Sequence, residues 1–175
     1  MPGIKRTATT PKELPEWIQK VRKAAYDNPD NFVQTQLKVT TKTAGIISFK
    51  YNWPQQQMAK SILLQENQGL PVRQFYLKAR QVGTTTSMAA RNFVRAWAKD
   101  NVECLFIAHY QERAEEVLER VKGFYQSMDV RLRLALSRDS KHAIQFADTR
   151  SKMTIVSSKT LEHARGGTKQ HIHIT

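Results

Sequence analysis

The residues best suited to chemistry in this sequence lie between positions 78 and 86, in the stretch KARQVGTTT. Apolar residues precede this stretch and a helical pattern follows it, so Gly83 stands where a strand would turn into a helix. A phosphate-binding loop needs backbone N–H groups aimed at the anion, a helix N-terminus, a cation and a hydroxyl for Mg²⁺. Gly83 and Thr85 match the second glycine and the hydroxyl of such a loop.

The stretch departs from the common phosphate-loop pattern at two positions. Lys78 replaces the first glycine, and Thr84 stands where the lysine is normally found. On the pattern alone, an ordinary strand, turn and helix is the better interpretation. Two features favour a nucleotide site instead: Lys78 and Arg80 bring two cations into the loop, and three successive threonines offer hydroxyl and N–H groups in the first helical turn. The candidate nucleotide-binding residues are Lys78, Arg80, Gln81, Val82, Gly83, Thr84, Thr85 and Thr86, with Thr85 as the metal ligand.

The stretch LKARQVGTTTSMA (77–89) resembles the altered Walker A loop of large terminase subunits, the ATPases that pump DNA into the capsids of phages and related viruses. In that family a basic residue early in the loop replaces or supplements the usual lysine, which implies that Lys78 and Arg80 are the cations here. The resemblance covers most of the chain after residue 28. It implies ATP and Mg²⁺ as ligands and double-stranded DNA as the translocated partner. It further implies a small terminase subunit, a capsid portal, a homo-oligomer during packaging, and the cytoplasm of an infected bacterial host.

The same family carries a glutamine that recognises adenine, spaced three residues after an asparagine. Asn52 and Gln55 fit that spacing. A carboxamide can donate to and accept from the edge of adenine at once. Because three glutamines follow one another, the assignment could shift to Gln56 or Gln57, and a polar first turn of a surface helix is the alternative.

The C-terminal third resembles the family's approach to its catalytic acids. Residues 105–125 are similar to a second strand and helix, and residues 157–175 to the stretch that leads into the Walker B strand. The resemblance implies that the acids and a nuclease domain would follow Thr175, so the chain as given is expected to bind ATP but hydrolyse little. Arg165 is a candidate arginine finger, a DNA contact or simply part of a polar loop.

The elements that must position these residues can be read from periodicity. Helices are expected at 14–26, from Asn52 to about 68, at 84–98 and at 111–126, with a break at 27–31. Hairpins are expected within 35–51 and 141–157, and single strands at 73–79, 104–108 and 171–175. The expected fold is α/β: a three-layer P-loop ATPase core with a mostly parallel sheet. The expected organisation is a flexible basic leader (1–13), a helical and hairpin adenine-recognition subregion (14–70) and an incomplete core (71–175).

Charge points to a polyanionic partner. The 175 residues contain 28 Lys and Arg against 15 Asp and Glu, a net charge of +13. Nucleic acid is the first candidate and an anionic membrane the second, against the alternative of a merely basic, solvated surface. Cys104 is the only cysteine, which excludes an internal disulfide. No apolar run approaches the length needed to span a bilayer, and the start of the chain lacks the apolar segment of a signal peptide.

Two other functions compete with the terminase reading. A helicase-type P-loop ATPase would normally keep the lysine after the glycine. A basic nucleic-acid-binding domain with a purely structural loop would not bind nucleotide at all. His171 and His173 alternate with isoleucines and lack the further ligands that a metal site needs, so a half-buried edge strand is the better interpretation of this run.

Overall fold

The computed structural model describes residues 14–41, 44–164 and 166–175. Helix α1 (Glu16–Asp27) ends where the sequence predicts a break, and Asn28 then caps a second helix, α2 (Pro29–Gln36), by accepting from the Asn31 N–H. Proline at the first position of α2 costs little because its missing N–H would have no partner in the helix. The break at 27–31 is therefore a junction between two helices, and the sequence pattern did not predict the second one.

A hairpin and a third helix follow. Strands β1 (Lys38–Thr41) and β2 (Gly45–Ser48) pair antiparallel, as predicted. Helix α3 (Trp53–Asn67) begins after Asn52, whose side chain accepts from the Gln55 N–H while the Gln55 side chain accepts from the Asn52 N–H. This reciprocal capping box satisfies two N–H groups at the start of the helix, which explains why α3 begins there.

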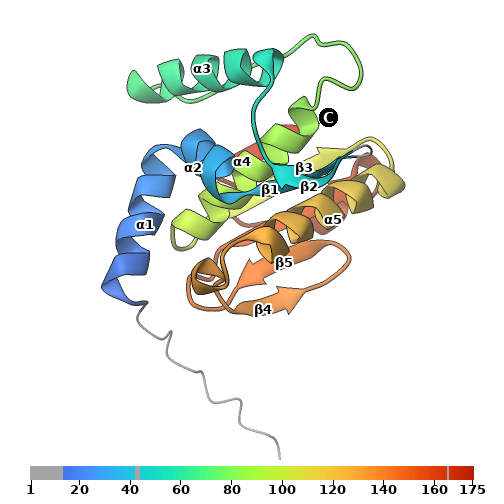
Figure 1. The fold of residues 1–175 in the computed structure, drawn as a ribbon. Coiled ribbons are helices and arrows are strands. Elements are labelled where there is room, and N and C mark those ends of the chain that lie inside the picture. Colours follow the sequence, from blue (N-terminus) through green and yellow to red (C-terminus); the bar gives the residue numbers. More distant parts are fainter. Residues whose placement is uncertain (1–13, 42–43, 165) are drawn as a thin grey trace, which may run out of the picture.

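The main sheet has five strands in the order β4-β5-β6-β3-β7 (Figure 1). Its strands are β3 (Glu103–Ala108), β4 (Leu136–Asp139), β5 (Ala143–Phe146), β6 (Lys152–Ser157) and β7 (His171–Ile174). Strands β6 and β7 run parallel to β3, whereas β5 is antiparallel to β4 and β6. The α/β class is confirmed, but the sheet is mixed and not mostly parallel, with two parallel and two antiparallel strand pairs among the described residues. The parallel strands end together at one edge, where ligands of such sheets bind.

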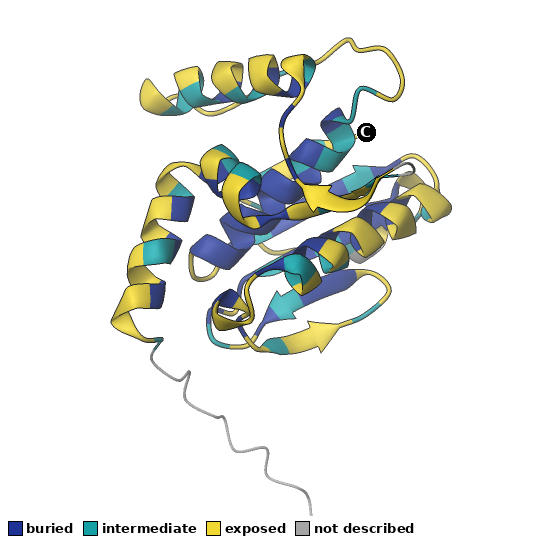
Figure 2. Cartoon of the chain, viewed as in Figure 1, coloured by how far each residue is buried: buried dark blue, intermediate teal, exposed yellow. Residues whose placement is uncertain are grey.

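Helices α4 (Thr84–Ala98) and α5 (Gln111–Ser127) pack on one face of this sheet and enclose the core. Phe93, Trp97, Phe106 and Phe124 are all buried there, and Figure 2 shows α4 as the most completely buried helix. The opposite face of β6 and β3 carries the 3₁₀ helix η2 (Ser158–Ala164). Within the described residues no α-helix covers that face, so the third layer expected from the sequence is not present in this part of the chain.

The N-terminal elements share this core. The ring of Phe32 on α2 stacks on Trp97 of α4 at 4.8 Å between centroids, and Phe49, after β2, stacks on Phe124 of α5 at 5.9 Å. Residues from both predicted regions, 14–70 and 71–175, therefore belong to one hydrophobic cluster.

The strand predicted at 73–79 is wrong. This segment has no regular secondary structure, and the side chains of Phe75 and Leu77 are fully exposed, at 104% and 106%. Its alternating pattern suits a strand, but a strand also needs a neighbour for its backbone hydrogen bonds. Strand β7 pairs with β3 on one side and forms the edge of the described sheet on the other.

Candidate phosphate-binding loop

The loop before α4 contains two residues with a positive φ, a feature that anion-binding loops share. Gln81 has a φ of 64° and Gly83 a φ of 74°, while Val82 between them has a negative φ. Where a right-handed helical residue adjoins a left-handed one, successive N–H groups can turn toward one concave side. Gly83 directly precedes the first helical residue, Thr84, so the N-terminus of α4 lies behind the loop.

The start of α3 holds this loop in place. The Asn52 side-chain N–H₂ donates to the Val82 carbonyl at 3.1 Å, and the Gln55 N–H₂ donates to the Gly83 carbonyl at 2.9 Å. Gln55 is buried, and its side-chain oxygen already accepts from the Asn52 N–H at 2.9 Å. The structure thus places Gln55 beside the loop but engages both ends of its carboxamide, and recognition of adenine by Gln55 stays a prediction. The Asn52 and Gln55 spacing singled out these two residues for adenine recognition or for a polar first helical turn, and it did not indicate their contact with the loop.

Two threonine hydroxyls stand at the head of α4. Thr84 is buried, and its hydroxyl has no hydrogen-bond partner among the described residues, a state that is rare for buried polar groups. The Thr85 hydroxyl lies 3.1 Å from that of Thr175, and the Thr175 N–H donates to the Ile107 carbonyl at 2.9 Å. The metal ligand predicted from the sequence therefore lies against the C-terminal end of β7. Nothing in the sequence pattern paired these two positions, which are 90 residues apart.

The two predicted loop cations are exposed. Neither Lys78 nor Arg80 makes an ion pair within the described chain, and Arg80 opens the turn that leads to Gly83. Lys78 lies close enough to β7 to affect His173: burial lowers the pKa of His173 to about 4, and the positive charge of Lys78 adds to that lowering. The positive charge of Lys78 is therefore within electrostatic range of β7.

A second set of contacts joins the far ends of α3 and α4. Glu66 accepts from Arg91 at 2.7 Å and from Arg95 at 2.5 Å, and Arg91 also pairs with Asp30 of α2. Both arginine side chains are less than a tenth exposed. Buried cations need such partners, because an unpaired charge in the interior is costly. The helix that carries the loop is thus fixed to its neighbours at both ends.

Arg165, the predicted arginine finger, lies outside the described residues, as does the basic leader at 1–13. Among the described residues no group of three or more His, Cys, Asp or Glu side chains could hold a metal ion. Mg²⁺ bound with a nucleotide commonly takes only one or two protein ligands besides phosphate oxygens and water, and a single threonine hydroxyl fits that pattern.

Compared with models of protein families and with curated proteins, the chain matches none. In the described part of the chain, no helix combines the length and the apolar character that crossing a membrane requires.

Proposed function

We propose that this chain is the ATP-binding core of a DNA-translocating motor of the large terminase class, with a P-loop fold. ATP and Mg²⁺ would bind at residues 78–86, and the bound nucleotide would drive movement of double-stranded DNA held through its backbone. The observation that carries this proposal is the 3.1 Å contact between the Thr85 and Thr175 hydroxyls. This contact supports the proposal because it joins the hydroxyl proposed to bind Mg²⁺ to the end of a parallel strand, and in a P-loop ATPase acids would act from such a strand end.

The residues of the loop suit a nucleoside triphosphate. The left-handed residues Gln81 and Gly83 favour an N–H-lined concavity, and the unpartnered hydroxyl of buried Thr84 suits a hydrogen-bonding ligand. Lys78 and Arg80 would neutralise phosphate charge, while Thr85 would contribute a metal ligand. Bound Mg²⁺ would supply charge neutralisation and orientation of the phosphates.

Isothermal titration calorimetry with ATP and Mg²⁺ tests the proposal. Replacing Lys78 or Arg80 with alanine should weaken ATP binding by about 1.5–3 kcal/mol each, the value of a charge-assisted hydrogen bond. Lys60→Ala is the matched control, because Lys60 is an exposed lysine on α3 that makes no ion pair in the described chain, and it should leave the affinity unchanged. Wild-type affinity in the Lys78→Ala, Arg80→Ala and double variants would show that the loop cations do not bind nucleotide.

Thr85 provides the second arm of this test. Thr85→Ala should remove the gain in ATP affinity that Mg²⁺ produces, whereas Thr85→Ser, which keeps the hydroxyl, should retain most of it. Absence of ATP binding in the wild-type chain would favour a nucleic-acid-binding domain with a structural loop instead.

A further inference from the structure

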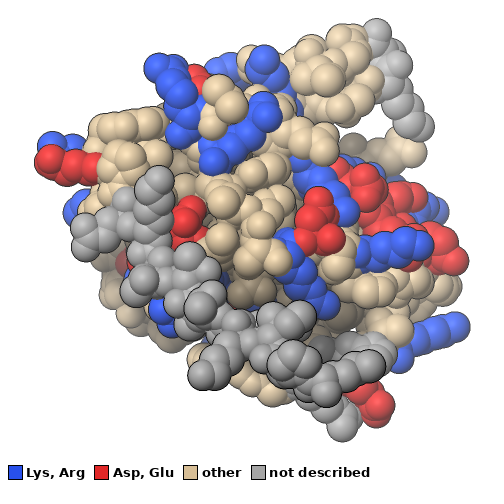
Figure 3. Space-filling view, turned by 90° about the horizontal axis from the view of Figure 1, so that it is seen from below, with Lys and Arg blue, Asp and Glu red and all other residues tan. Residues whose placement is uncertain are grey.

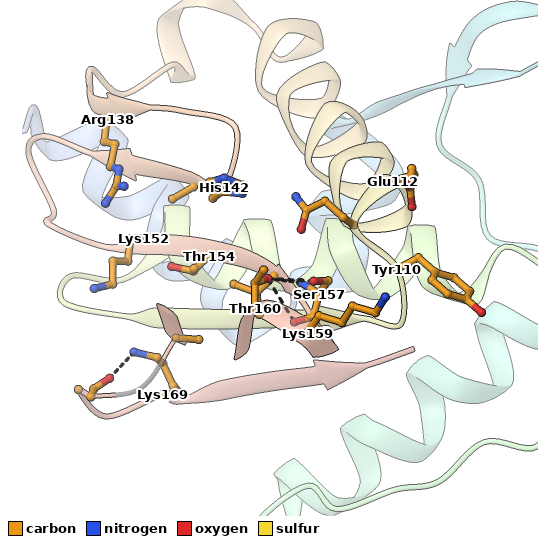
Figure 4. A pocket seen from close by; sticks show the side chains of 16 residues that line it. Tyr110, Glu112, Arg138, His142, Lys152, Thr154, Ser157, Lys159, Thr160 and Lys169 are labelled. Carbon is orange, nitrogen blue, oxygen red and sulfur yellow. Dashed lines mark hydrogen bonds between the residues drawn. The ribbon is translucent and has the colours of Figure 1, made fainter. Parts of the chain in front are cut away.

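A cavity of about 1030 Å³ opens on the face of the sheet that carries η2, and none of residues 78–86 lines it. Its floor consists of alternate residues of two strands, Ala143 from β5 and Thr154 and Val156 from β6. Figure 4 shows side chains entering it from β4, from the turn before β5, and from the segments after β3 and β6. The cavity is therefore a site separate from the phosphate-binding loop.

The lining of this cavity is strongly basic. Among the described lining residues, Glu112 is the only acidic one. The cations among the lining residues are Arg138, Lys152, Lys159 and Lys169, and His142 also lines the cavity. Figure 3 shows the molecule from below the view of Figure 1: basic side chains gather in one group on this face, and others alternate with acidic ones.

Two of these cations are structural. Lys152 and Lys169 both pair with Glu103, at 2.9 and 2.6 Å. Burial opposes ionisation of Glu103, but the hydrogen bonds from the two lysines outweigh it and lower the pKa of this carboxyl. One carboxylate between two ammonium groups leaves a net positive charge at this end of the cavity.

The other two cations are not paired with a carboxylate in the described chain. Arg138 on β4 and Lys159 on η2 are exposed and make no ion pair within the described chain. Figure 4 shows them on opposite sides of the cavity, with Arg138 near His142 and Lys159 near Tyr110. Because the two cations enter the cavity from different elements, each could meet a different phosphate of an extended nucleic-acid backbone.

We propose that this cavity binds backbone phosphates of double-stranded DNA, with Arg138 and Lys159 as the contacts that are free to neutralise them. The proposal deepens the proposed function, on which it rests for the identity of the partner, by naming where the DNA binds. Phosphate contacts of this kind carry no sequence information, which suits a motor that must move along any sequence.

The test is a titration of the chain with a fluorescent DNA duplex at several salt concentrations. Each lost phosphate contact reduces the slope of log affinity against log salt by about 0.9. The double variant Arg138→Gln and Lys159→Gln should therefore lower the slope by about 2 and weaken binding by about tenfold or more. The matched control, Lys20→Gln with Lys60→Gln, removes the same net charge from α1 and α3 and should change the slope little.

Thermal unfolding of both double variants establishes that each is folded, and calorimetry with ATP separates the two proposals. If ATP binds but the cavity double variant has the same salt slope and DNA affinity as the control double variant, the cavity proposal fails and the proposed function stands. If ATP does not bind but only the cavity variant loses salt dependence, the proposed function fails and the DNA site stands. Titration with inorganic phosphate is the third arm: binding of phosphate that depends on Arg138, with unchanged DNA binding, would identify a small-anion site and overturn the proposal.

Discussion

Gly83 decides how the loop and α3 meet. Its φ of 74° is one that residues with a side chain rarely adopt, and a Cβ added there would lie 2.7 Å from the Gln55 side-chain nitrogen. That nitrogen donates to the Gly83 carbonyl, so the close approach and the hydrogen bond have the same origin. Two reasons therefore favour glycine at this position: the left-handed backbone conformation, and the lack of room for a Cβ beside Gln55.

Gly83→Ala should lower the free energy of unfolding by about 2–3 kcal/mol, as strain at a left-handed residue adds to the clash with Gln55. Gly69→Ala is the matched control. Gly69 has a φ of 68° and nothing within 4 Å of its Cβ position, so only the backbone cost of about 1 kcal/mol applies. Urea unfolding measures both. Equal losses in the two variants would show that the contact between Gln55 and the loop is not close in solution.

At the scale of elements, α3 and α4 are joined at both ends. Asn52 and Gln55 hold the loop before α4, and Glu66 near the end of α3 accepts from two arginines of α4. Movement of the loop would therefore have to be accommodated by α3. A clamp of this kind suits a site whose N–H groups must keep their direction before a ligand arrives.

Glu66→Gln tests the far end of this clamp. It removes the charge that balances Arg91 and Arg95 and should lower the free energy of unfolding by about 3 kcal/mol, as expected for breaking a largely buried pair. Glu16→Gln breaks the exposed pair with Lys20 and should change it by less than about 1 kcal/mol. Denaturant unfolding of both variants provides the comparison, and a cost for Glu66→Gln as small as that of the control would contradict a buried network.

At the scale of the whole molecule, β7 makes stability depend on pH. Burial lowers the pKa of both His171 and His173 to about 4, with nearby arginines adding to the effect at His171 and Lys78 at His173. The unfolded chain binds these protons near the ordinary histidine pKa of about 6.5, and the folded chain only near pH 4. The stability that the two neutral histidines contribute is therefore fully present above about pH 6.5 and is lost as the pH falls toward 4.

Each histidine should contribute up to about 1.4 kcal/mol of lost stability per pH unit across this window. Unfolding free energies at pH 7 and pH 5 measure the loss, and the variant with both histidines changed to glutamine should show a smaller difference between the two. His142→Gln is the control, because it removes an exposed histidine that lies outside β7, on the turn before β5. An identical pH dependence in the wild type and the double variant would mean that the two histidines are not buried as described.

The sequence by itself determined the elements whose signals are local. The apolar period from Ala90 to Trp97, the helix start at Asn52 and the alternation of Ile144, Phe146, Met153 and Ile155 predicted helices and a hairpin that the structure contains. It also singled out the loop around Gly83, because turn chemistry and the start of a helix depend only on neighbours in the chain.

The tertiary structure decided what depends on partners far along the chain. Residues 73–79 have the alternation of a strand but no neighbour to pair with, so they are not one. The clamp of Gln55 on Gly83, the contact between Thr85 and Thr175, and the gathering of Arg138 and Lys159 around one cavity each join segments at least twenty residues apart. No local pattern encodes such contacts, because sheet order and helix packing alone bring these residues together.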